Sequence, residues 1–328
     1  MESVTPEPIL KTALGFMAAK QLFAASEIGL FAALAAAPLG LDALAERTGV
    51  PRHAARIVAD AMVSLGLLEK DDDRYRNGVV AAAFLAGGEE SGLRPTLRQF
   101  DRISYRLWLD FETIVRAGRG RPHWGEWSAE EQSIASAGIA ALTMPVAAAL
   151  ASNYDFGRHR HLLDLGGGTG NFLVAILGRH PGLSGILYEL PDTAAVARQA
   201  LAGRPEAARL AIAEGDLFKD PLPAGADAVL IANLVHLFAP EQNRDMLHRV
   251  RRQVAAGARL LLVDFWTDPT HTGPPPIPLL AGEFLLWAGA GDVYSAEEAR
   301  SWLRETGWRP LAHEPLAGPQ SLIVAETA

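Results

Sequence analysis

The chain has 328 residues, no cysteine and a formal net charge of −8 at neutral pH. The missing thiols exclude disulfides, thiolate metal ligands and a cysteine nucleophile, and the acidic balance disfavours nucleic acid as a partner. Hydrophobic residues make up 49% of the chain, so a sizeable core is expected. No apolar run reaches the roughly 18 to 20 residues of a membrane span, and the N-terminal segment is acidic where a secretory signal is basic. We therefore expect a soluble, cytoplasmic protein.

The first part of the chain is predicted to be helical and to end in a β-hairpin. Residues 8–37 predict one or two amphipathic helices, with an apolar stripe wide enough to suggest a partner surface. Two more helices are expected over 41–50 and 51–68. Residues 68–80 predict a hairpin that turns at Asp71–Asp73. Helix, turn, helix and hairpin together define a winged helix, which we assign to a domain over residues 1–85.

A winged helix often binds DNA, but the charges of this one argue against that function. Residues 1–110 hold twelve Lys and Arg against fourteen Asp and Glu, whereas a surface that faces phosphates should be clearly basic. The second helix carries only Arg52, His53 and Arg56 near its start, and the hairpin tip is triply acidic. Packing and dimerisation is therefore the preferred interpretation. A regulator that senses a small molecule and binds DNA remains the alternative from another functional class.

Residues 86–152 are predicted to be a helical connector that contributes to a substrate pocket. They hold an aromatic-rich helix over 97–118 and a long alanine-rich helix over 128–154. Such aromatic residues can form an ordinary core, or they can line a pocket between domains. The candidate substrate contacts here and further along the chain are Phe100, Tyr105, Trp108, Met144, Phe284 and Trp287.

The motif around which the rest of the chain is organised is HLLDLGGGTGNF, at residues 161–172. A short apolar strand leads through a glycine turn into a helix, which is the first unit of a nucleotide-binding α/β sheet. The dinucleotide pattern G-x-G-x-x-G fails, because the sixth position from Gly166 is Asn171, and the chain has no P-loop pattern. What remains is D-x-G-x-G-x-G, formed by Asp164, Gly166, Gly168 and Gly170.

The remainder of the chain alternates strands and helices, as an α/β sheet requires. Further strands are predicted over 185–189, 210–214, 226–232, 258–265, 310–314 and 322–326, and helices over 192–201, 241–255 and 296–306. The last helix should begin with a capping box formed by Ser295 and Glu298. Residues 271–278, HTGPPPIP, predict a rigid loop in a position to shape a site.

Polar residues follow the strands of this predicted sheet at the edge where ligands bind in open α/β folds. Glu189 ends the second strand about twenty residues beyond the glycine turn, where an acid can accept hydrogen bonds from both ribose hydroxyls of an adenosine. Asp216 follows the third strand and could receive an adenine amino group. Asn233 and His236 follow the fourth strand, and Asp264 ends the fifth.

These motifs resemble those of class I S-adenosylmethionine (SAM) methyltransferases. Four segments, LLDLGGGTGNF, ELPDTAAVAR, GDLFKDPLP and NLVHLFAPEQNRDML, are similar to the small-molecule O-methyltransferases of the caffeate, isoflavone and hydroxyindole kind, which include bacterial polyketide tailoring enzymes. The resemblance implies an α/β Rossmann-like domain over 153–328, with a mostly parallel seven-stranded sheet, preceded by an all-α/winged-helix dimerisation domain. It also implies a homodimer that binds SAM, releases S-adenosyl-L-homocysteine (SAH) and takes a small-molecule acceptor. The candidate cofactor contacts are Asp164, Gly166, Gly168, Gly170, Glu189, Leu190, Gly215, Asp216, Leu217, Phe218 and Asn233.

In this family the histidine beyond the fourth strand is the general base, and the matching residue is His236. An imidazole suits the removal of a hydroxyl proton at neutral pH. Asp264 matches the first of two acids that orient the histidine, although it is one methylene shorter than the usual glutamate. Val293 stands at the second position, with Asp292 beside it, so that match fails, and Phe238 stands where the family has tryptophan.

The departures from the family pattern leave the acceptor open. Relatives on the same scaffold also methylate carbon or nitrogen, and a few transfer no methyl group, so these reactions are the alternatives to O-methylation. A metal site formed by His236, His271, Asp264 and Glu283 was weighed as well. No short-spaced pair of ligands supports it, and no metal is expected.

Overall fold

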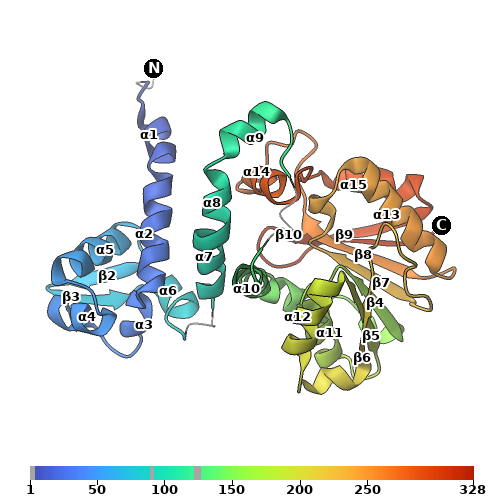
Figure 1. The fold of residues 1–328 in the computed structure, drawn as a ribbon, viewed down its shortest axis with the longest axis horizontal. Coiled ribbons are helices and arrows are strands. Elements are labelled where there is room, and N and C mark those ends of the chain that lie inside the picture. Colours follow the sequence, from blue (N-terminus) through green and yellow to red (C-terminus); the bar gives the residue numbers. More distant parts are fainter. Residues whose placement is uncertain (1–3, 89–91, 122–126) are drawn as a thin grey trace. The chain divides into compact units, whose positions relative to one another are not determined.

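The computed structural model describes residues 4–88, 92–121 and 127–328. The chain forms two compact units, one of Met1–Arg106 with Ala129–Leu142 and the other of Leu107–Ser128 with Thr143–Ala328 (Figure 1). The region predicted as a connector, 86–152, is thus divided between the two units.

The first unit contains the predicted winged helix. Its helices are α1 (Glu7–Ala13), α2 (Gly15–Glu27), α3 (Leu30–Ala33), α4 (Leu41–Thr48), α5 (Arg52–Ser64) and α6 (Val79–Phe84). Its three-stranded antiparallel sheet has the order β1-β3-β2, with β1 at Leu39–Gly40, β2 at Leu68–Asp71 and β3 at Arg74–Asn77. The N-terminal segment forms three helices, where one or two were expected, because Gly29 adopts φ +72° between α2 and α3.

The aromatic segment after the winged helix is not one continuous helix, so that prediction is wrong. It consists of α7 (Arg94–Gln99), a π-helical turn (Phe100–Ser104), α8 (Tyr105–Trp108) and α9 (Phe111–Ala117). The widened turn interrupts the regular i to i−4 hydrogen bonding at the aromatic residue Phe100. The long alanine-rich helix is confirmed as α10 (Ala129–Asn153).

Helix α10 also corrects the expectation about membrane spans. Within the described part of the chain it is the one helix long and apolar enough, by length and composition, to cross a membrane. Ser136, Thr143 and Pro145 interrupt the apolar residues of this helix, so the sequence shows no unbroken apolar run of that length, although the mean hydropathy is high enough. Val146, Ala147 and Leu150 of this helix are buried in a core cluster, as in core helices of soluble proteins, which pass the same test.

The second unit is built on the predicted seven-stranded sheet. Its strands are β4 (His161–Leu165), β5 (Ser184–Glu189), β6 (Leu210–Glu214), β7 (Ala228–Ala232), β8 (Arg259–Phe265), β9 (Trp308–Pro315) and β10 (Gln320–Thr327). They lie in the order β6-β5-β4-β7-β8-β10-β9 and are parallel except for β10, which is antiparallel to both of its neighbours. Each predicted strand is confirmed to within two residues at its ends. The strand order reverses between β4 and β7, where ligands bind in such sheets.

Besides α9 and the C-terminal part of α10, this unit contains α11 (Asn171–Arg179), α12 (Pro191–Leu201), α13 (Pro240–Gln253), α14 (Ile277–Ala288) and α15 (Ala296–Glu305), with short 3-10 turns at Phe156–Arg158, Pro205–Arg209 and Val235–Leu237. The capping box of α15 is confirmed, since Glu298 N donates to Ser295 Oγ at 3.2 Å and Ser295 N donates to Glu298 Oε2 at 2.7 Å. The loop predicted at 271–278 ends earlier than expected, because α14 begins at Ile277.

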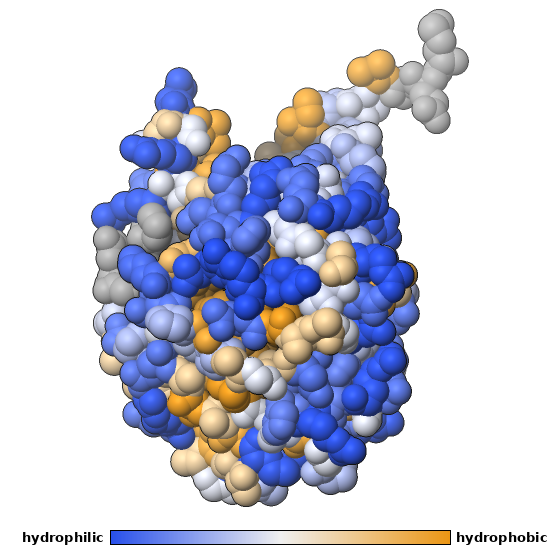
Figure 2. Space-filling view, turned by 90° about the vertical axis from the view of Figure 1, so that its right-hand side faces the viewer, coloured by the Kyte–Doolittle hydropathy of each residue, from blue (hydrophilic) through white to orange (hydrophobic). Residues whose placement is uncertain are grey.

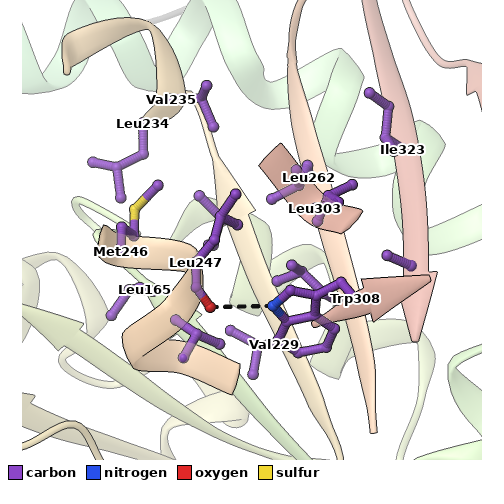
Figure 3. Close-up of a cluster of buried hydrophobic side chains, with 14 of the residues drawn as sticks. Leu165, Val229, Leu234, Val235, Met246, Leu247, Leu262, Leu303, Trp308 and Ile323 are labelled. Carbon is purple, nitrogen blue, oxygen red and sulfur yellow. Dashed lines mark hydrogen bonds between the residues drawn. The ribbon is translucent and has the colours of Figure 1, made fainter. Parts of the chain in front are cut away.

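Two hydrophobic clusters fill this unit. In one of them, side chains of β7 and β8 meet those of α13, α15 and β9 (Figure 3). The buried indole of Trp308 donates a hydrogen bond from Nε1 to the carbonyl of Leu247 at 3.1 Å, which ties the edge strand β9 to α13. On the surface face drawn in Figure 2, hydrophilic residues predominate and hydrophobic residues form smaller patches between them.

Candidate active site

The glycine turn after β4 leaves one glycine open to a ligand. Gly166, Gly168 and Gly170 all have positive φ angles, at +67°, +60° and +84°. A Cβ atom added to Gly168 would meet nothing within 4 Å, whereas one added to Gly167 would lie 2.3 Å from Oδ2 of Asp164. The turn is therefore closely packed on its inner side and open at Gly168, as the approach of a ligand to the backbone requires.

Glu189 joins the end of β5 to this turn. Its Oε1 accepts a hydrogen bond from Gly168 N at 2.9 Å, and its Oε2 accepts one from Leu190 N at 2.9 Å. Burial raises the pKa of the Glu189 carboxyl, and the two backbone N–H groups act in the opposite direction. The structure thus brings a predicted ribose-binding acid next to the open glycine, and the half-exposed Leu190 follows it at the start of α12.

Asp164 lies beneath the turn. Its carboxyl is completely buried, and neither oxygen has a hydrogen-bond partner in the structure. Burial and the nearby charge of Glu189 raise its pKa to about 8. This position does not suit the direct cofactor contact expected from the sequence, because the carboxyl faces the inner side of the turn at Gly167.

The loop after β6 is anchored to β5, because Gly215 N donates to the carbonyl of Glu189 at 3.0 Å. Asp216 closes its own turn, accepting from Phe218 N at 2.9 Å and from Lys219 Nζ at 2.7 Å. The Lys219 ammonium holds the pKa of the Asp216 carboxyl below its usual range. Leu217 and Phe218 pack against the core at the same place.

Asn233, directly after β7, has a positive φ of 55°. Its backbone N–H donates to the carbonyl of Val263 at 2.8 Å, and its Oδ1 accepts a hydrogen bond from Nε2 of Gln320. Gln320 is a buried residue that the sequence analysis missed. It begins β10 opposite Phe265, which places it at the same edge of the sheet as Asp264.

His236 and Asp264 form a buried pair. Nδ1 of His236 lies 2.6 Å from Oδ1 of Asp264, and the side chains are only 7% and 1% exposed. Because an ionised carboxylate only accepts hydrogen bonds, Nδ1 carries the proton and Nε2 is left with a free lone pair. The backbone N–H of His236 points at Oδ2 of the same carboxylate at 3.4 Å, and Phe265 N donates to Oδ1 at 2.8 Å.

The His236 ring is also stacked on an aromatic ring. Phe284, from α14, lies with its ring centroid 3.7 Å from that of His236 and its plane tilted by 18°. On the other side of the turn, Asp292 N donates to the carbonyl of His236 at 3.0 Å. Val293 is buried and supplies no carboxylate, while the Asp292 carboxylate accepts from Val293 N at 2.7 Å. The described geometry therefore gives the histidine one acid, Asp264.

The other candidate substrate residues fall into two groups. The ring of Trp108 lies 4.5 Å from that of Phe111, tilted by 44°, and its Nε1 donates to Glu283 at 2.5 Å, which places Trp108 beside α14. Trp287, also on α14, is buried, with its ring centroid 4.9 Å from that of Trp127, and Met144 is half-exposed. Phe100 and Tyr105 belong to the first unit.

Among the described residues, no three His, Asp or Glu side chains gather closely enough to hold a metal ion. Of the four weighed as ligands, His271 lies 3.0 Å from Glu298, and Glu283 accepts the Trp108 indole.

Comparison with known proteins places this geometry in a family. A model described as an O-methyltransferase domain matches residues 116–309, and one described as an O-methyltransferase dimerisation domain matches residues 10–87. The 3-hydroxy-5-methyl-1-naphthoate 3-O-methyltransferase of Streptomyces sahachiroi is 32% identical over 320 residues, which cover 96% of this chain and 92% of that protein. The N,N-dimethyltransferase OxyT of Streptomyces rimosus is 30% identical over 92% of this chain and 90% of its own.

Solved structures agree with these relatives. The structure of PigF with SAH has a TM-score of 0.86 and 27% identity, and covers 99% of this chain and 100% of its own. Human N-acetylserotonin methyltransferase in complex with SAM, at 24% identity and a TM-score of 0.88, shows the same fold over 100% of this chain and 99% of its own. Both domain matches and relatives that align over nearly the whole length lead to one conclusion: this chain belongs to the SAM-dependent O-methyltransferase family.

Proposed function

We propose that the protein transfers the methyl group of SAM to a hydroxyl group of an aromatic or polyketide-like small molecule, with His236 as the general base. The observation that carries this proposal is the buried His236–Asp264 pair, in which Nδ1 is occupied and Nε2 is left to accept a proton. The naphthoate O-methyltransferase of Streptomyces sahachiroi supports an aromatic hydroxyl as the acceptor.

The residues at the strand ends fit SAM. Gly168 is open where an added Cβ would meet no neighbour, and Glu189 lies next to it with a carboxylate suited to ribose hydroxyls. We assign Gly166, Gly168, Gly170, Glu189, Leu190, Gly215, Leu217, Phe218 and Asn233 to the cofactor site, with Asp216 at its adenine end. Bound there, SAM supplies a methyl carbon on a sulfonium sulfur, which is an electrophile without further activation.

The role of the chain's own residues follows from acid–base chemistry. With SAM bound, the hydroxyl proton of the acceptor would pass to Nε2 of His236 as the methyl group is transferred to the acceptor oxygen. Asp264 then stabilises the imidazolium that forms, as a hydrogen-bonded carboxylate does in other histidine bases. Such a positioned base contributes roughly 10²- to 10⁴-fold to the rate. Phe284, Trp108, Trp287 and Met144, which all belong to the second unit, are proposed to line the acceptor site.

The match to a dimerisation domain supports a homodimer, and we propose that α1 and α2 contribute to its interface. Ile9, Leu10, Leu14, Phe16 and Met17 leave about half or more of their area exposed on these helices, which is unusual for a surface that faces only water. We further propose that the protein is cytoplasmic and binds neither nucleic acid nor membranes. A gel shift at low salt and fractionation of cell extracts would test these two points.

Nitrogen methylation is the second candidate, because one relative of 30% identity is named as an N,N-dimethyltransferase. The same base could remove the proton of an amine. Mass spectrometry of the product together with NMR separates the two, since O-methyl and N-methyl groups differ in chemical shift.

The deciding experiment is calorimetric titration of the intact protein and of Glu189→Ala with SAM and SAH, followed by turnover of an acceptor panel by intact protein and His236→Ala. We expect Glu189→Ala to lose affinity for both, and His236→Ala to bind SAM normally but to lose turnover. Absence of SAM binding to the intact protein would refute the cofactor assignment. Full turnover by His236→Ala would refute the base.

A further inference from the structure

We propose that Asn243 is a positioning residue of the reaction, which holds the turn that carries His236 and thereby aims the base. The proposal rests on the function proposed above. Asn243 lies in α13, seven residues after His236, and its side chain is completely buried. No motif in the sequence analysis assigned it a role.

The side chain of Asn243 hydrogen-bonds to backbone carbonyls on both sides of His236. Nδ2 of Asn243 donates to the carbonyl of Val235 at 3.0 Å and to the carbonyl of Phe238 at 3.0 Å. These two carbonyls lie on either side of His236 in the chain. A single amide group from a neighbouring helix therefore fixes the segment from which the imidazole projects.

The orientation of the Asn243 amide follows from its neighbours. Two carbonyl oxygens require two N–H donors, and the flipped amide would place Oδ1 against both of them. In the orientation that satisfies the carbonyls, Oδ1 is buried without a hydrogen-bond partner in the described structure. An unpaired buried acceptor is rare in folded proteins and destabilises them. The two hydrogen bonds that the amide donates are therefore made at an energetic cost at Oδ1.

Two other hydrogen bonds hold the same backbone turn, but neither of them involves the imidazole ring. The hydroxyl of Tyr294 donates to the carbonyl of Phe238 at 2.7 Å, and Asp292 N donates to the carbonyl of His236. With Val293 in place of a second acid, Asp264 is the one acid bonded to the ring among the described residues, and Phe284 and Phe265 are the aromatic rings beside it. The position of the ring thus depends on the backbone turn more than it would with two carboxylates.

The test is Asn243→Ala, with Val250→Ala as the matched control. Val250 is also completely buried on α13 but belongs to the core cluster and makes no contact with the turn through a side-chain hydrogen bond. We expect Asn243→Ala to lower kcat about 10- to 100-fold, the order expected when a catalytic group is displaced by a fraction of an ångström to one ångström. Its Kd for SAM should stay within about twofold, because the Glu189 site is untouched. Val250→Ala should lower Tm but keep kcat.

A double variant separates action through His236 from a general effect. If Asn243 acts through the base, His236→Ala and His236→Ala/Asn243→Ala have the same residual rate, because the second change has nothing left to disturb. Tyr294→Phe is the milder variant should Asn243→Ala fail to fold. It removes one donor from the Phe238 carbonyl, and we expect a several-fold fall in kcat at unchanged SAM affinity.

Three results would overturn the proposal. Asn243→Ala, or Tyr294→Phe in its place, could lower kcat no more than Val250→Ala does. The loss could also be as large in the His236→Ala background as in the intact protein. Finally, full turnover by His236→Ala would remove the base assignment itself, and this outcome is distinguishable from the first two, in which His236→Ala retains only a low residual rate.

Discussion

The Asp264→Asn substitution tests the base most directly, because it changes one atom in the buried pair. In the intact protein, Oδ1 of Asp264 accepts from Nδ1 of His236 at 2.6 Å and from Phe265 N at 2.8 Å. The Phe265 N–H should keep the oxygen of the new amide in place. In the intact protein, Oδ2 lies 3.4 Å from the backbone N of His236. In the variant the amide nitrogen takes the place of Oδ2, so that two hydrogen-bond donors face each other.

The expected loss can be worked from these contacts. A hydrogen bond to a charged group contributes about 1.5 to 3 kcal/mol, and each 1.36 kcal/mol is a factor of ten in rate. Loss of the carboxylate charge should therefore lower kcat by about 10- to 150-fold. If instead the amide rotates and donates to Nδ1, the imidazole takes the wrong tautomer, and the loss approaches about 10⁴-fold.

The assay is single-turnover methyl transfer at saturating SAM, with calorimetric measurement of SAM affinity. Asp227→Asn is the control, since Asp227 also caps backbone N–H groups, those of Arg160 at 2.8 Å and His161 at 3.1 Å, but precedes β7 at the opposite edge of the sheet. We expect Asp227→Asn to affect stability and not kcat. Wild-type kcat in Asp264→Asn, or an equal loss in both variants, would refute the reasoning.

Three further predictions concern the cofactor turn, the buried acid and the dimer. Gly168→Ala should fold but lose at least about tenfold in SAM affinity, because its Cβ enters the open space over the turn, whereas Gly203→Ala, with a similar φ of +74° and equally open surroundings, should bind normally by calorimetry. The raised pKa of Asp164 means that the folded protein holds a proton that the unfolded chain releases above about pH 4, so native stability falls as pH rises toward 8. Asp164→Asn should remove this slope in urea unfolding, and an unchanged slope would contradict the assignment. Phe16→Asp should convert the dimer to a monomer in light scattering, and a variant that stays dimeric would exclude α2 from the interface.

The sheet was predictable because its signals are local. Each buried parallel strand appears as a short apolar run, and the residue at its carboxyl end is fixed by chain order. Glu189, Asn233 and Asp264 could therefore be placed at one edge of the sheet before the strand order was known. The capping box at Ser295 is equally local, since both partners lie within one turn.

The parts that were missed depend on tertiary contacts. The π-helical turn at Phe100–Ser104 has no distinct sequence pattern, and the apolar residues of α10 are interrupted by polar ones. Gln320 reaches Asn233 from a strand far along the chain, which no spacing rule connects. Asn243 did leave a signal, because it occupies a position of the apolar face that continues through Met246, Leu247 and Val250 at helical spacing. A polar residue on such a face needs buried hydrogen-bond partners. Nδ2 of Asn243 has two of them, whereas its Oδ1 has none among the described residues, which is destabilising.

The absence of a second acid at Val293 and the side-chain hydrogen bonds that hold the His236 turn have one explanation. A base needs its lone pair held toward the acceptor, and this can be achieved by fixing the imidazole directly or by fixing the backbone that carries it. With Val293 at the second position, the described residues offer the imidazole one acid, Asp264, and the neighbouring rings of Phe284 and Phe265. The carbonyls of Val235 and Phe238 then receive side-chain donors from α13 and from Tyr294. A carboxylate restored by Val293→Glu should consequently make turnover less sensitive to Asn243→Ala, provided that the buried charge is tolerated, and an equal sensitivity in both backgrounds would show that the two supports are independent.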